Sequence, residues 1–588
     1  MNTPLQQWCL HLRLKGAKQA LYCLEACYFD GCLQDKSAVA EFYFSGSLRQ
    51  KVQQKKQSEM SGVTHPDELL SLLAGNSNRS AIESLASLEG CFTLWKSNLE
   101  QGSWFFYRSA LSGPPVFYYQ KEDQLIIGTD LVQMRRLLPD LGIEQRWFSH
   151  FFAAQTPDTG QTPFAQIQSL PAGCAMQVNN DDVLVVDGRP KISVVSHESE
   201  QQWIDAWRTS TQDAVARSVS GHNKVAIMLS SGLDSGALAA LLSQSKPDAL
   251  EQFQAFCWRF PNHAQADESV YIEEITQYLK LPVHYIDIAE TQCFVDVDTW
   301  PVALQAPYFN AMRRMKHDLY QTVTERGFSV LLNGHYGDNL YYSDRYELAE
   351  LWQEKQWGNF VSQLQSIIGQ KKHKAHLDPA VRYWVKQMLR LADRPQWIPD
   401  WLTDTAQDLL FSAKEVSSNN LMVSGQDSDH RSHHRPDQYK QLLAPSQFDA
   451  LATEYEFTQS YGLQRVHPYL DMRLFSLALS CRAWLLNQPG KTKYIMRQAL
   501  QGLLPETSLR RSRVGQLDSL FIDGLNKHQD SIRDYLFRNE RCWPQFVEQD
   551  RVRQVLDKQQ WQYAASIIVP CLGYERWLDE WRQTGLPV

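Results

Sequence analysis

The strongest chemical signal in the sequence is the stretch VAIMLSSGLDSGALAALL at residues 225–242, where an apolar strand runs into a turn of hydroxyls, glycine and a carboxylate. Backbone N–H groups of such a turn, its hydroxyls and the positive end of the following helix converge where the strand ends, and together they favour an anion such as phosphate. A carboxylate there would repel phosphate unless it binds a divalent cation, so Asp234 is predicted to be a Mg²⁺ ligand. The alternative is an ordinary Ser/Gly/Asp turn that caps a helix.

A second turn with a carboxylate follows another apolar strand, in the stretch FSVLLNGHYGDNLYY. This turn contains Asn333, Gly334, His335, Gly337 and Asp338. The carboxyl ends of strands in an open parallel sheet lie at one edge, where ligands bind. Asp234 and Asp338 are therefore predicted to share one or two Mg²⁺ ions that bridge a polyphosphate.

The hydrophobic pattern predicts the elements that position these turns. From about residue 17 to 180, short alternating segments between turn residues predict antiparallel sheet. After the polar segment VVDGRPKISVVSHESEQQ, apolar strands alternate with helical stretches, which is typical of parallel βαβ units. Residues 345–440 are Trp-rich and helical, and they end in a polar run that we interpret as a mobile loop.

Composition excludes several classes of protein. The 588 residues include 58 Lys and Arg against 66 Asp and Glu, a net charge of −8, and 43% are hydrophobic, so the chain is neither disordered nor collagen-like. The dispersed acidic charge argues against nucleic acid as a partner. No apolar run reaches the ~18 residues that span a membrane, so a cytoplasmic protein is expected.

Two cysteine and histidine patterns were weighed as metal sites. The 11 cysteines are scattered without a CxxC pair, so neither a zinc ribbon nor a disulfide framework is indicated. His430, His433 and His434 cluster in the polar run, where a solvated loop is a better interpretation than metal binding.

Taken in this order, the motifs resemble the asparagine synthetase family of ATP-pyrophosphatases. The family signature SGGLDS is present as SSGLDS, and its second motif, roughly SGxGxDE, is present as NGHYGDN. The resemblance continues at DES (267–269), at RVHPYLD (465–471) and at KTKYIMRQALQGLLPETSLRRSR (491–513). LEGCFTLW, YRSALSGPPVFYY, LIIGTD and TPFAQIQSLPAG are similar to the family's amidotransferase-type domain.

The resemblance implies a fold and a reaction. It implies an α+β amidotransferase-like sandwich at residues 1–185, followed at 200–588 by an α/β parallel-sheet ATP-pyrophosphatase domain, similar to the adenine nucleotide alpha hydrolases, with a helical insertion near 345–440. The reaction is attack of a carboxylate on the α-phosphate of ATP, followed by displacement of AMP by an amine. The implied cofactors are ATP and Mg²⁺, the latter on Asp234 and Asp338. The ATP-binding residues are then Leu229, Ser230, Ser231, Gly232, Asp234, Ser235, Trp258, Asn333 and Gly334.

The N-terminus departs from the family's glutamine-hydrolysing members, whose nucleophile is a cysteine exposed by removal of the initiator Met. Residue two is Asn2, and the first cysteine is Cys9. The N-terminal domain is therefore expected to be catalytically inactive. The amine would then be free ammonia or an amino group of the substrate itself.

Three positions of the synthetase part also depart from the family. His335 gives a GHxGD pattern that resembles the lasso-peptide cyclases. At this position, ammonia-using members of the family tend to have Glu and β-lactam synthetases tend to have Tyr. His335 would accept the amine's proton or orient the turn. Arg513 replaces the family's lysine, and its guanidinium would stabilise an oxyanion or phosphate, unless it belongs to a solvated basic cluster. Asn339 replaces an acid, which leaves the number of Mg²⁺ ions open.

These observations favour a macrolactam-forming lasso-peptide cyclase that acts on a precursor peptide, with a leader-binding protein and a leader protease as partners. A β-lactam-type cyclase, an ammonia-dependent asparagine synthetase and a nucleotide-binding scaffold without activity are the alternatives. The Trp-rich insertion either forms a wall that binds the peptide or packs as helix core; its tryptophans are Trp352, Trp357, Trp384, Trp397 and Trp401.

Overall fold

The computed structural model covers the whole chain and describes most of it. The described residues are 2–3, 8–14, 22–29, 32–34, 42–48, 82, 85, 90–98, 102–111, 114–155, 157, 160–179, 182–188, 195–245, 252–300, 302–341, 345–389, 398–411, 442, 451, 453–455, 457–458, 460–488, 491–511 and 517–586. Arg513, Trp397 and the polar run with His430, His433 and His434 lie outside them.

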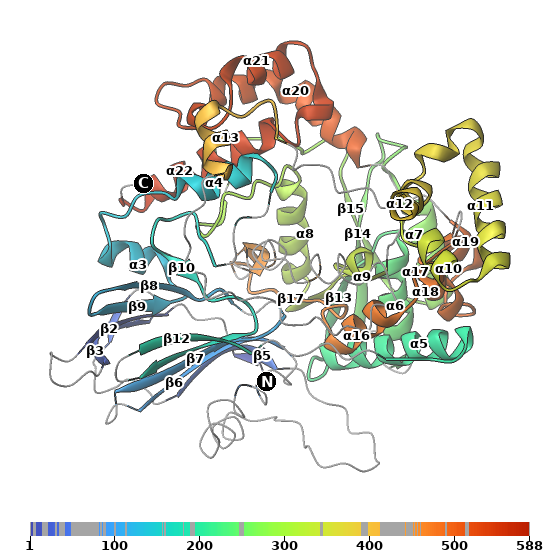
Figure 1. The fold of residues 1–588 in the computed structure, drawn as a ribbon, viewed down its shortest axis with the longest axis horizontal. Helices are drawn as coiled ribbons and strands as arrows, with labels where there is room; N and C mark the ends of the chain where they lie inside the picture. Colours follow the sequence, from blue (N-terminus) through green and yellow to red (C-terminus); the bar gives the residue numbers. More distant parts are fainter. Residues whose placement is uncertain are drawn as a thin grey trace.

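The N-terminal part is a sandwich of two antiparallel sheets (Figure 1). The first sheet has the order β1-β5-β6-β7-β11-β12, from β1 Asn2–Thr3, β5 Phe42–Leu48, β6 Gly90–Asn98, β7 Ser103–Arg108, β11 Cys174–Asn179 and β12 Asp182–Asp187. The second has the order β10-β8-β9-β2-β3-β4, from β2 Trp8–Leu14, β3 Tyr22–Phe29, β4 Cys32–Gln34, β8 Phe117–Lys121, β9 Gln124–Gly128 and β10 Gln168–Ser169. The predicted antiparallel sheet is confirmed, although strands already begin before residue 17.

Large apolar side chains fill the space between the two sheets. Trp8 and Leu10 of β2 pack in one buried cluster with Trp95, Trp104 and Phe106 of the opposite sheet. The rings of Trp8 and Phe106 are stacked with centroids 6.0 Å apart. Alternate residues of each strand point inward, which is why segments such as GSWFFYRS show the two-residue pattern of a half-buried strand. Two helices, α3 Leu131–Leu137 and α4 Gln145–Phe152, complete this part.

The second part is built on a five-stranded parallel sheet with the order β15-β14-β13-β16-β17. Its strands are β13 Val225–Met228, β14 Phe253–Arg259, β15 Val283–Asp287, β16 Val330–Leu332 and β17 Gln464–Val466. From the central strand β13 the chain adds β14 and β15 on one side and then β16 and β17 on the other. The direction of winding therefore changes between β13 and β16, which is where open α/β sheets bind ligands.

Helices cover both faces of this sheet because successive side chains of a strand point to opposite faces. Val225 and Ile227 of β13 are buried in a cluster with residues of α6, whereas Ala226 is buried with residues of α8 on the other face. These helices are α5 Glu200–Ser218, α6 Leu233–Ser245, α7 Ser269–Leu279, α8 Arg313–Glu325, α9 Gly337–Tyr341, α16 Met472–Ser480, α17 Ala483–Leu486, α18 Tyr494–Ala499 and α19 Glu506–Arg510. A hairpin of β18 Asn487–Gln488 and β19 Lys491–Thr492 lies between α17 and α18.

The insertion between β16 and β17 is helical, as predicted, where it is described. It contains α10 Glu347–Gln353, α11 Trp357–Lys371, the 3-10 helix η3 Lys372–Leu377, α12 Pro379–Met388 and α13 Asp404–Phe411. Trp352 packs edge-on against Trp357, with ring centroids 4.8 Å apart, and lies 5.5 Å from Trp384. Trp401 is buried and donates a hydrogen bond to the carbonyl of Phe152. Core packing therefore accounts for most of these tryptophans.

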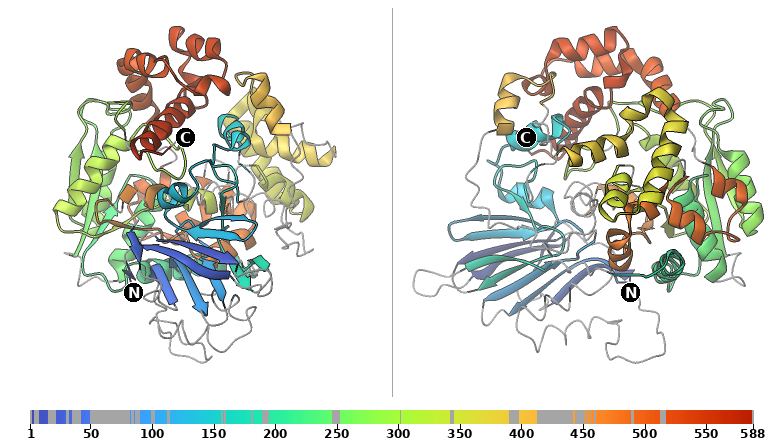
Figure 2. Two further views of the ribbon diagram at one scale, coloured as in Figure 1. Left: turned by 90° about the vertical axis from the view of Figure 1, so that its left-hand side faces the viewer. Right: turned by 45° about the vertical axis from the view of Figure 1, so that its right-hand side comes forward.

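The last helices join the two parts of the molecule (Figure 2). They are α20 Asp518–Leu536, η4 Trp543–Gln545, α21 Gln549–Asp557, η5 Trp561–Tyr563 and α22 Ile568–Gln583. Phe148 of α4 lies 4.7 Å from Tyr574 and 5.4 Å from Trp577 of α22, measured between ring centroids. The N-terminal sandwich and the C-terminal helices thus share one hydrophobic cluster.

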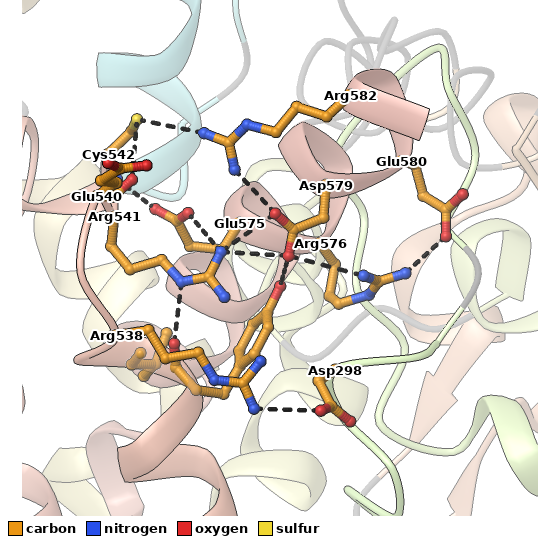
Figure 3. Close-up of polar contacts among 12 residues, drawn as sticks. Asp298, Arg538, Glu540, Arg541, Cys542, Glu575, Arg576, Asp579, Glu580 and Arg582 are labelled. Carbon is orange, nitrogen blue, oxygen red and sulfur yellow. Dashed lines mark hydrogen bonds and ion pairs between the residues drawn. The ribbon is translucent and has the colours of Figure 1, made fainter. Parts of the chain in front are cut away.

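A buried ionic network joins α22 to the segment that follows α20 (Figure 3). Glu575 is fully buried, and its Oε1 accepts hydrogen bonds of 2.7 Å from the backbone N–H groups of Cys542 and Trp543. Arg541 pairs with Glu575 at 3.3 Å and with Asp579 at 3.2 Å. Each buried charge therefore has a partner, as burial requires.

Candidate nucleotide and metal site

The Ser/Gly turn identified in the sequence lies at the carboxyl end of β13. Ser230 N–H donates to Ser235 Oγ at 3.1 Å, and Gly232 N–H donates to Ser230 Oγ at 3.2 Å. Helix α6 begins at Leu233, directly after the turn, so its first N–H groups and the turn lie together. Ser230 is exposed and Ser231 is buried. The hydroxyls thus hold the turn in shape while one side of it remains open to solvent.

The turn after β16 packs directly against the turn after β13, and two glycines make this possible. A Cβ atom on Gly334 would lie 2.8 Å from the backbone N of Ser235, and one on Gly337 would lie 2.8 Å from Asp234 Cβ. Both contacts are closer than side chains allow. Between them, Tyr336 is buried and has a positive φ of 77°, which is an uncommon and strained conformation for a non-glycine residue. The structure therefore brings Asp234 and Asp338 to one edge, as predicted.

A lysine that the sequence reasoning did not single out lies between the two carboxylates. Lys493 Nζ is 2.5 Å from Asp234 Oδ2 and 2.7 Å from Asp338 Oδ1. The side chains of Lys493 and Asp234 are 9% and 16% exposed, whereas that of Asp338 is 79% exposed. Lys493 belongs to the quoted segment KTKYIMR, but 259 residues separate it from Asp234 and only the fold brings the two together.

Asp234 has the surroundings of a cation ligand. Burial raises the pKa of its carboxyl, against the opposing effect of Lys493. Its Oδ1 is buried and has no hydrogen-bond partner within the described part of the chain, while the hydroxyl of Tyr469 donates to its backbone carbonyl at 3.1 Å. Mg²⁺ is usually bound by one or two carboxylates together with substrate phosphates. The donor set of Asp234 and Asp338 fits such an ion.

A second carboxylate supports the Ser/Gly turn from β14's side of the sheet. Glu268 accepts hydrogen bonds from the Ser231 N–H at 3.1 Å and from the Ser231 hydroxyl at 2.5 Å. Arg511 pairs with Glu268 at 3.6 Å, and its guanidinium lies over the ring of Tyr271. Glu268 lies in the DES segment that carried the family resemblance. Its role in fixing Ser231 was not predicted.

His335 lies at the same edge, beside the buried strand β17. Its backbone N–H donates to Asn333 Oδ1, and the same oxygen is 3.0 Å from His467 Nδ1. Part of the residue reaches solvent, but protein atoms surround its ring, which lies 5.7 Å from the ring of His467. Burial of the ring, together with the cations Arg465 and Lys316, lowers the pKa of His335 to about 4. The imidazole is therefore neutral at physiological pH.

The cations near His335 belong to a half-buried cluster that was also not predicted. Glu454 accepts from Lys316 at 2.6 Å and from Arg465 at 2.7 Å, and Tyr320 donates to it at 3.2 Å. Despite burial, the two cations lower the pKa of Glu454 to about 2. Arg465 is part of the quoted RVHPYLD segment, so its position was identified without its partners.

The remaining predicted site residues lie at different places along this edge, and one of them is outside the described residues. Leu229 is buried and donates its N–H to the Phe256 carbonyl, so it is part of the sheet edge. Trp258, near the carboxyl end of β14, is half-buried, and its indole N–H lacks a hydrogen-bond partner in the described part of the chain. Asn339 follows Asp338 in α9. Arg513 lies outside the described residues, so its predicted role is untested.

Comparison with known protein families agrees with this geometry. The family model for asparagine synthase matches residues 206–579, and that for the glutamine amidotransferase domain matches residues 40–187. Because the first match spans more than half of the chain, the protein belongs to the asparagine synthase family. This membership places it among the ATP-dependent, AMP-forming carbon–nitrogen ligases.

Individual relatives are distant. The chain is similar to asparagine synthetase [glutamine-hydrolyzing] 1 of Bacillus subtilis, with 20% identity over 80% of this chain and 74% of the relative. It is 22% identical to a putative asparagine synthetase of Mycobacterium bovis, over 64% of this chain and 58% of that relative. Among solved structures, a tRNA thiolase from Methanococcus maripaludis shares 14% identity with a TM-score of 0.21, covering 45% of this chain and 85% of its own.

The described residues contain neither a membrane-spanning helix nor a larger group of metal-binding side chains. None of their helices combines the length and the apolar character needed to cross a membrane. Within the same residues, no group of three or more His, Cys, Asp or Glu side chains is arranged to hold a metal ion.

Proposed function

We propose that the protein adenylates a carboxylate with ATP and couples it to an amine within one precursor peptide, where the product is a macrolactam of the lasso-peptide kind. The observation that carries the proposal is the convergence of Asp234, Asp338 and Lys493 beside a Ser/Gly turn at the switch point of the parallel sheet. This arrangement supports an ATP-pyrophosphatase fold similar to the adenine nucleotide alpha hydrolases.

Each group at this edge has a role in binding ATP. The N–H groups of Ser230, Ser231 and Gly232 already donate to side chains at this edge, so the first N–H groups of α6 and the exposed hydroxyl of Ser230 would bind phosphate oxygens. Asp234 and Asp338 would hold Mg²⁺, which supplies neutralisation of the charge on the departing pyrophosphate. Lys493 pairs with both carboxylates, and from this position its ammonium would also be able to contact a phosphate oxygen of bound ATP.

The reaction then proceeds in two substitutions. An oxygen of the substrate carboxylate attacks the α-phosphorus of ATP, the bond to the β-phosphate oxygen breaks, and pyrophosphate leaves. The amine nitrogen next attacks the acyl carbon, the bond to the AMP oxygen breaks, and the amine loses its proton. The substrate therefore loses the elements of one water, and that oxygen leaves with AMP.

His335 connects this site with the choice of amine. Its neutral ring accepts a hydrogen bond from the attacking amine, but a pKa near 4 makes it a weak base, so positioning the amine is its main contribution. The GHxGD pattern around it is the feature that favours a macrolactam over asparagine. The partners proposed with this function are the precursor peptide, a leader-binding protein and a leader protease.

A second candidate is synthesis of asparagine from aspartate and ammonia. The names of the Bacillus and Mycobacterium relatives favour it, and the nucleotide site described above would serve it equally well. A β-lactam-type small-molecule cyclase uses the same chemistry. A scaffold that binds nucleotide without turnover is a further alternative, which the paired carboxylates Asp234 and Asp338 argue against.

Product analysis separates these functions. Purified protein with ATP and Mg²⁺ is incubated either with a candidate core peptide or with aspartate and ammonium, and mass spectrometry follows the products. A mass loss of about 18 Da from the peptide, which corresponds to one water, together with formation of AMP and pyrophosphate, supports the macrolactam. Asparagine in the other tube supports the second candidate. If neither tube yields a product when a cognate peptide and its partners are present, the synthetase proposal is contradicted.

We also propose that the N-terminal domain does not hydrolyse glutamine. Its antiparallel sandwich is intact, with β1 paired to β5 and Asn2 opposite Ser47, but Asn2 provides no thiol nucleophile. Incubation with glutamine should release no glutamate above the background. Glutamate formation that depends on the protein and is blocked by thiol alkylation would contradict this.

A further inference from the structure

Within the described part of the chain, the helices of the insertion carry a broad apolar surface that is only partly covered. In α11, apolar residues recur at positions 357, 360, 361, 364, 367 and 368, which form one wide helix face. Only part of this face is covered: Phe360 and Ile367 are buried in a small cluster, whereas Val361 and Ile368 are each 49% exposed. A helix face of this width normally packs against a second element.

The neighbouring elements extend the same kind of surface. Large apolar side chains are exposed on η3 and at the end of α12, namely Leu377, Met388 and Leu389, with Leu389 exposed to 64%. Trp357 at the start of α11 is also 48% exposed. Residues 357–389 hold the densest concentration of exposed large apolar side chains in the described part of the chain. We call this surface the insertion face.

The charge around the insertion face is positive, unlike the rest of the protein. Residues 357–390 contain six Lys or Arg and one acid, Asp378, in a chain whose net charge is −8. Asp378 is buried and caps α12 by accepting a hydrogen bond from the Ala380 N–H. Lys374 and Arg382 are exposed. The charged side chains that the structure shows exposed between residues 357 and 389 are therefore basic.

The insertion is also anchored to both segments that carry the proposed metal site. Helix α10 follows α9, which contains Asp338, and Glu350 of α10 accepts a hydrogen bond of 2.6 Å from the Ala483 N–H. Arg482 pairs with Glu354 at 2.8 Å, and these contacts reach the segment that leads into Lys493. Figure 1 shows α10, α11 and α12 together beside α17 and α18.

We infer that the insertion face binds an acidic, amphipathic helical segment of a partner polypeptide. Apolar side chains of that segment would cover the half-buried face of α11 and α12, and its carboxylates would pair with the basic side chains around it. Anchoring beside the synthetase site favours a polypeptide delivered to that site over a membrane surface. The inference concerns binding alone and does not depend on which amide the protein makes.

A binding measurement without ATP tests this inference. The probe is a fluorescent synthetic helix with Leu at i, i+3, i+4 and i+7 spacing and Glu elsewhere, and its anisotropy is followed during titration with the full-length protein. We expect saturable binding that weakens when salt is raised from about 0.15 to 0.5 M, because the charge pairs are screened. A peptide with Lys in place of every Glu should not bind.

Variants at exposed positions test the location without endangering the fold. The double substitution Val361→Ser and Leu389→Ser should weaken binding at least tenfold, as should Arg382→Glu. The matched controls are Ile522→Ser, at an exposed apolar residue of α20, and Lys558→Glu, at an exposed lysine after α21; neither should change the affinity.

Three results would overturn the inference. They are equal binding of the acidic and basic peptides, unchanged binding by the insertion-face variants, and absence of any peptide binding. Vesicles of phosphatidylserine and phosphatidylcholine provide the remaining comparison. Sedimentation with these vesicles but no peptide binding would identify the insertion face as a membrane contact instead.

Discussion

Replacing Lys493 with Met should destabilise the protein, because it removes the ammonium that lies between the two carboxylates of Asp234 and Asp338. The substitution keeps the length of the side chain and removes the ammonium that lies 2.5 Å from Asp234 and 2.7 Å from Asp338. Because Asp338 is largely exposed, its ion pair is worth at most about 1 kcal/mol. The partly buried pair with Asp234 dominates, so we expect a loss of roughly 2–3 kcal/mol in unfolding free energy near pH 8, below the 3–5 kcal/mol of a fully buried pair.

The loss should depend on pH, with a sign that follows from burial. Burial raises the pKa of Asp234 above its unfolded value even with Lys493 present, and removal of the ammonium raises it further. The folded variant then binds a proton that the unfolded chain does not, so its stability falls as pH rises through the raised pKa. The difference from the wild-type protein should be small near pH 5 and largest near pH 8.

Thermal unfolding and pyrophosphate release measure these effects. Mg²⁺ alone should raise the melting temperature of Lys493→Met, because its carboxylates are no longer neutralised, but not that of the wild-type protein. Pyrophosphate release should fall at least 100-fold, about 2.7 kcal/mol. The control is Lys491→Met, two residues earlier and exposed, which should behave as wild type. Equal destabilisation at both pH values, or by the control, would refute the reasoning.

Three further predictions concern other parts of the structure. Gly337→Ala should abolish ATP-dependent turnover because its Cβ would collide with Asp234, whereas Gly358→Ala, with no atom within 4 Å, should keep turnover in the same pyrophosphate assay. Because the pKa of His335 is lowered, only the unfolded chain binds a proton on this imidazole between about pH 4 and 6.5. The wild-type protein should therefore lose stability relative to His335→Gln as pH falls through this window. Melting curves of both proteins at pH 7.5 and 5 would show or disprove this. Glu575→Gln should cost roughly 2–4 kcal/mol in chemical denaturation by weakening the buried ionic network, and an unchanged midpoint would remove that role.

Local patterns predicted the parts of the fold that depend on neighbouring residues. The strand, turn and helix around Asp234 follow from an apolar run that ends in Ser, Gly and Asp, and the carboxyl-edge rule then placed Asp338 beside it. The sandwich strands also followed from their two-residue pattern. The strand at Trp8–Leu14 was missed, because its residues WCLHLRL lie before the region where alternation was recognised.

Long-range pairing explains what the sequence reasoning missed. Nothing local marks Lys493 as the partner of Asp234, or Glu454 as the carboxylate that Lys316 and Arg465 share. Lys493 is 259 residues from Asp234 and Lys316 is 138 residues from Glu454, so these two assignments need the sheet order, whereas Arg465 lies only 11 residues from Glu454. Burial was equally hard to foresee: the insertion tryptophans look alike in sequence, yet Trp401 is buried and Trp357 is half exposed.

The most direct test of the central claim is ATP- and Mg²⁺-dependent pyrophosphate release by the wild-type protein and by Asp234→Asn, with a carboxylate substrate that the product analysis has identified. The account predicts release that saturates with Mg²⁺ in the wild-type protein and a loss of at least 100-fold in the variant, with the fold intact by circular dichroism. Equal release by both proteins would contradict the assignment of Asp234 to the metal and phosphate site.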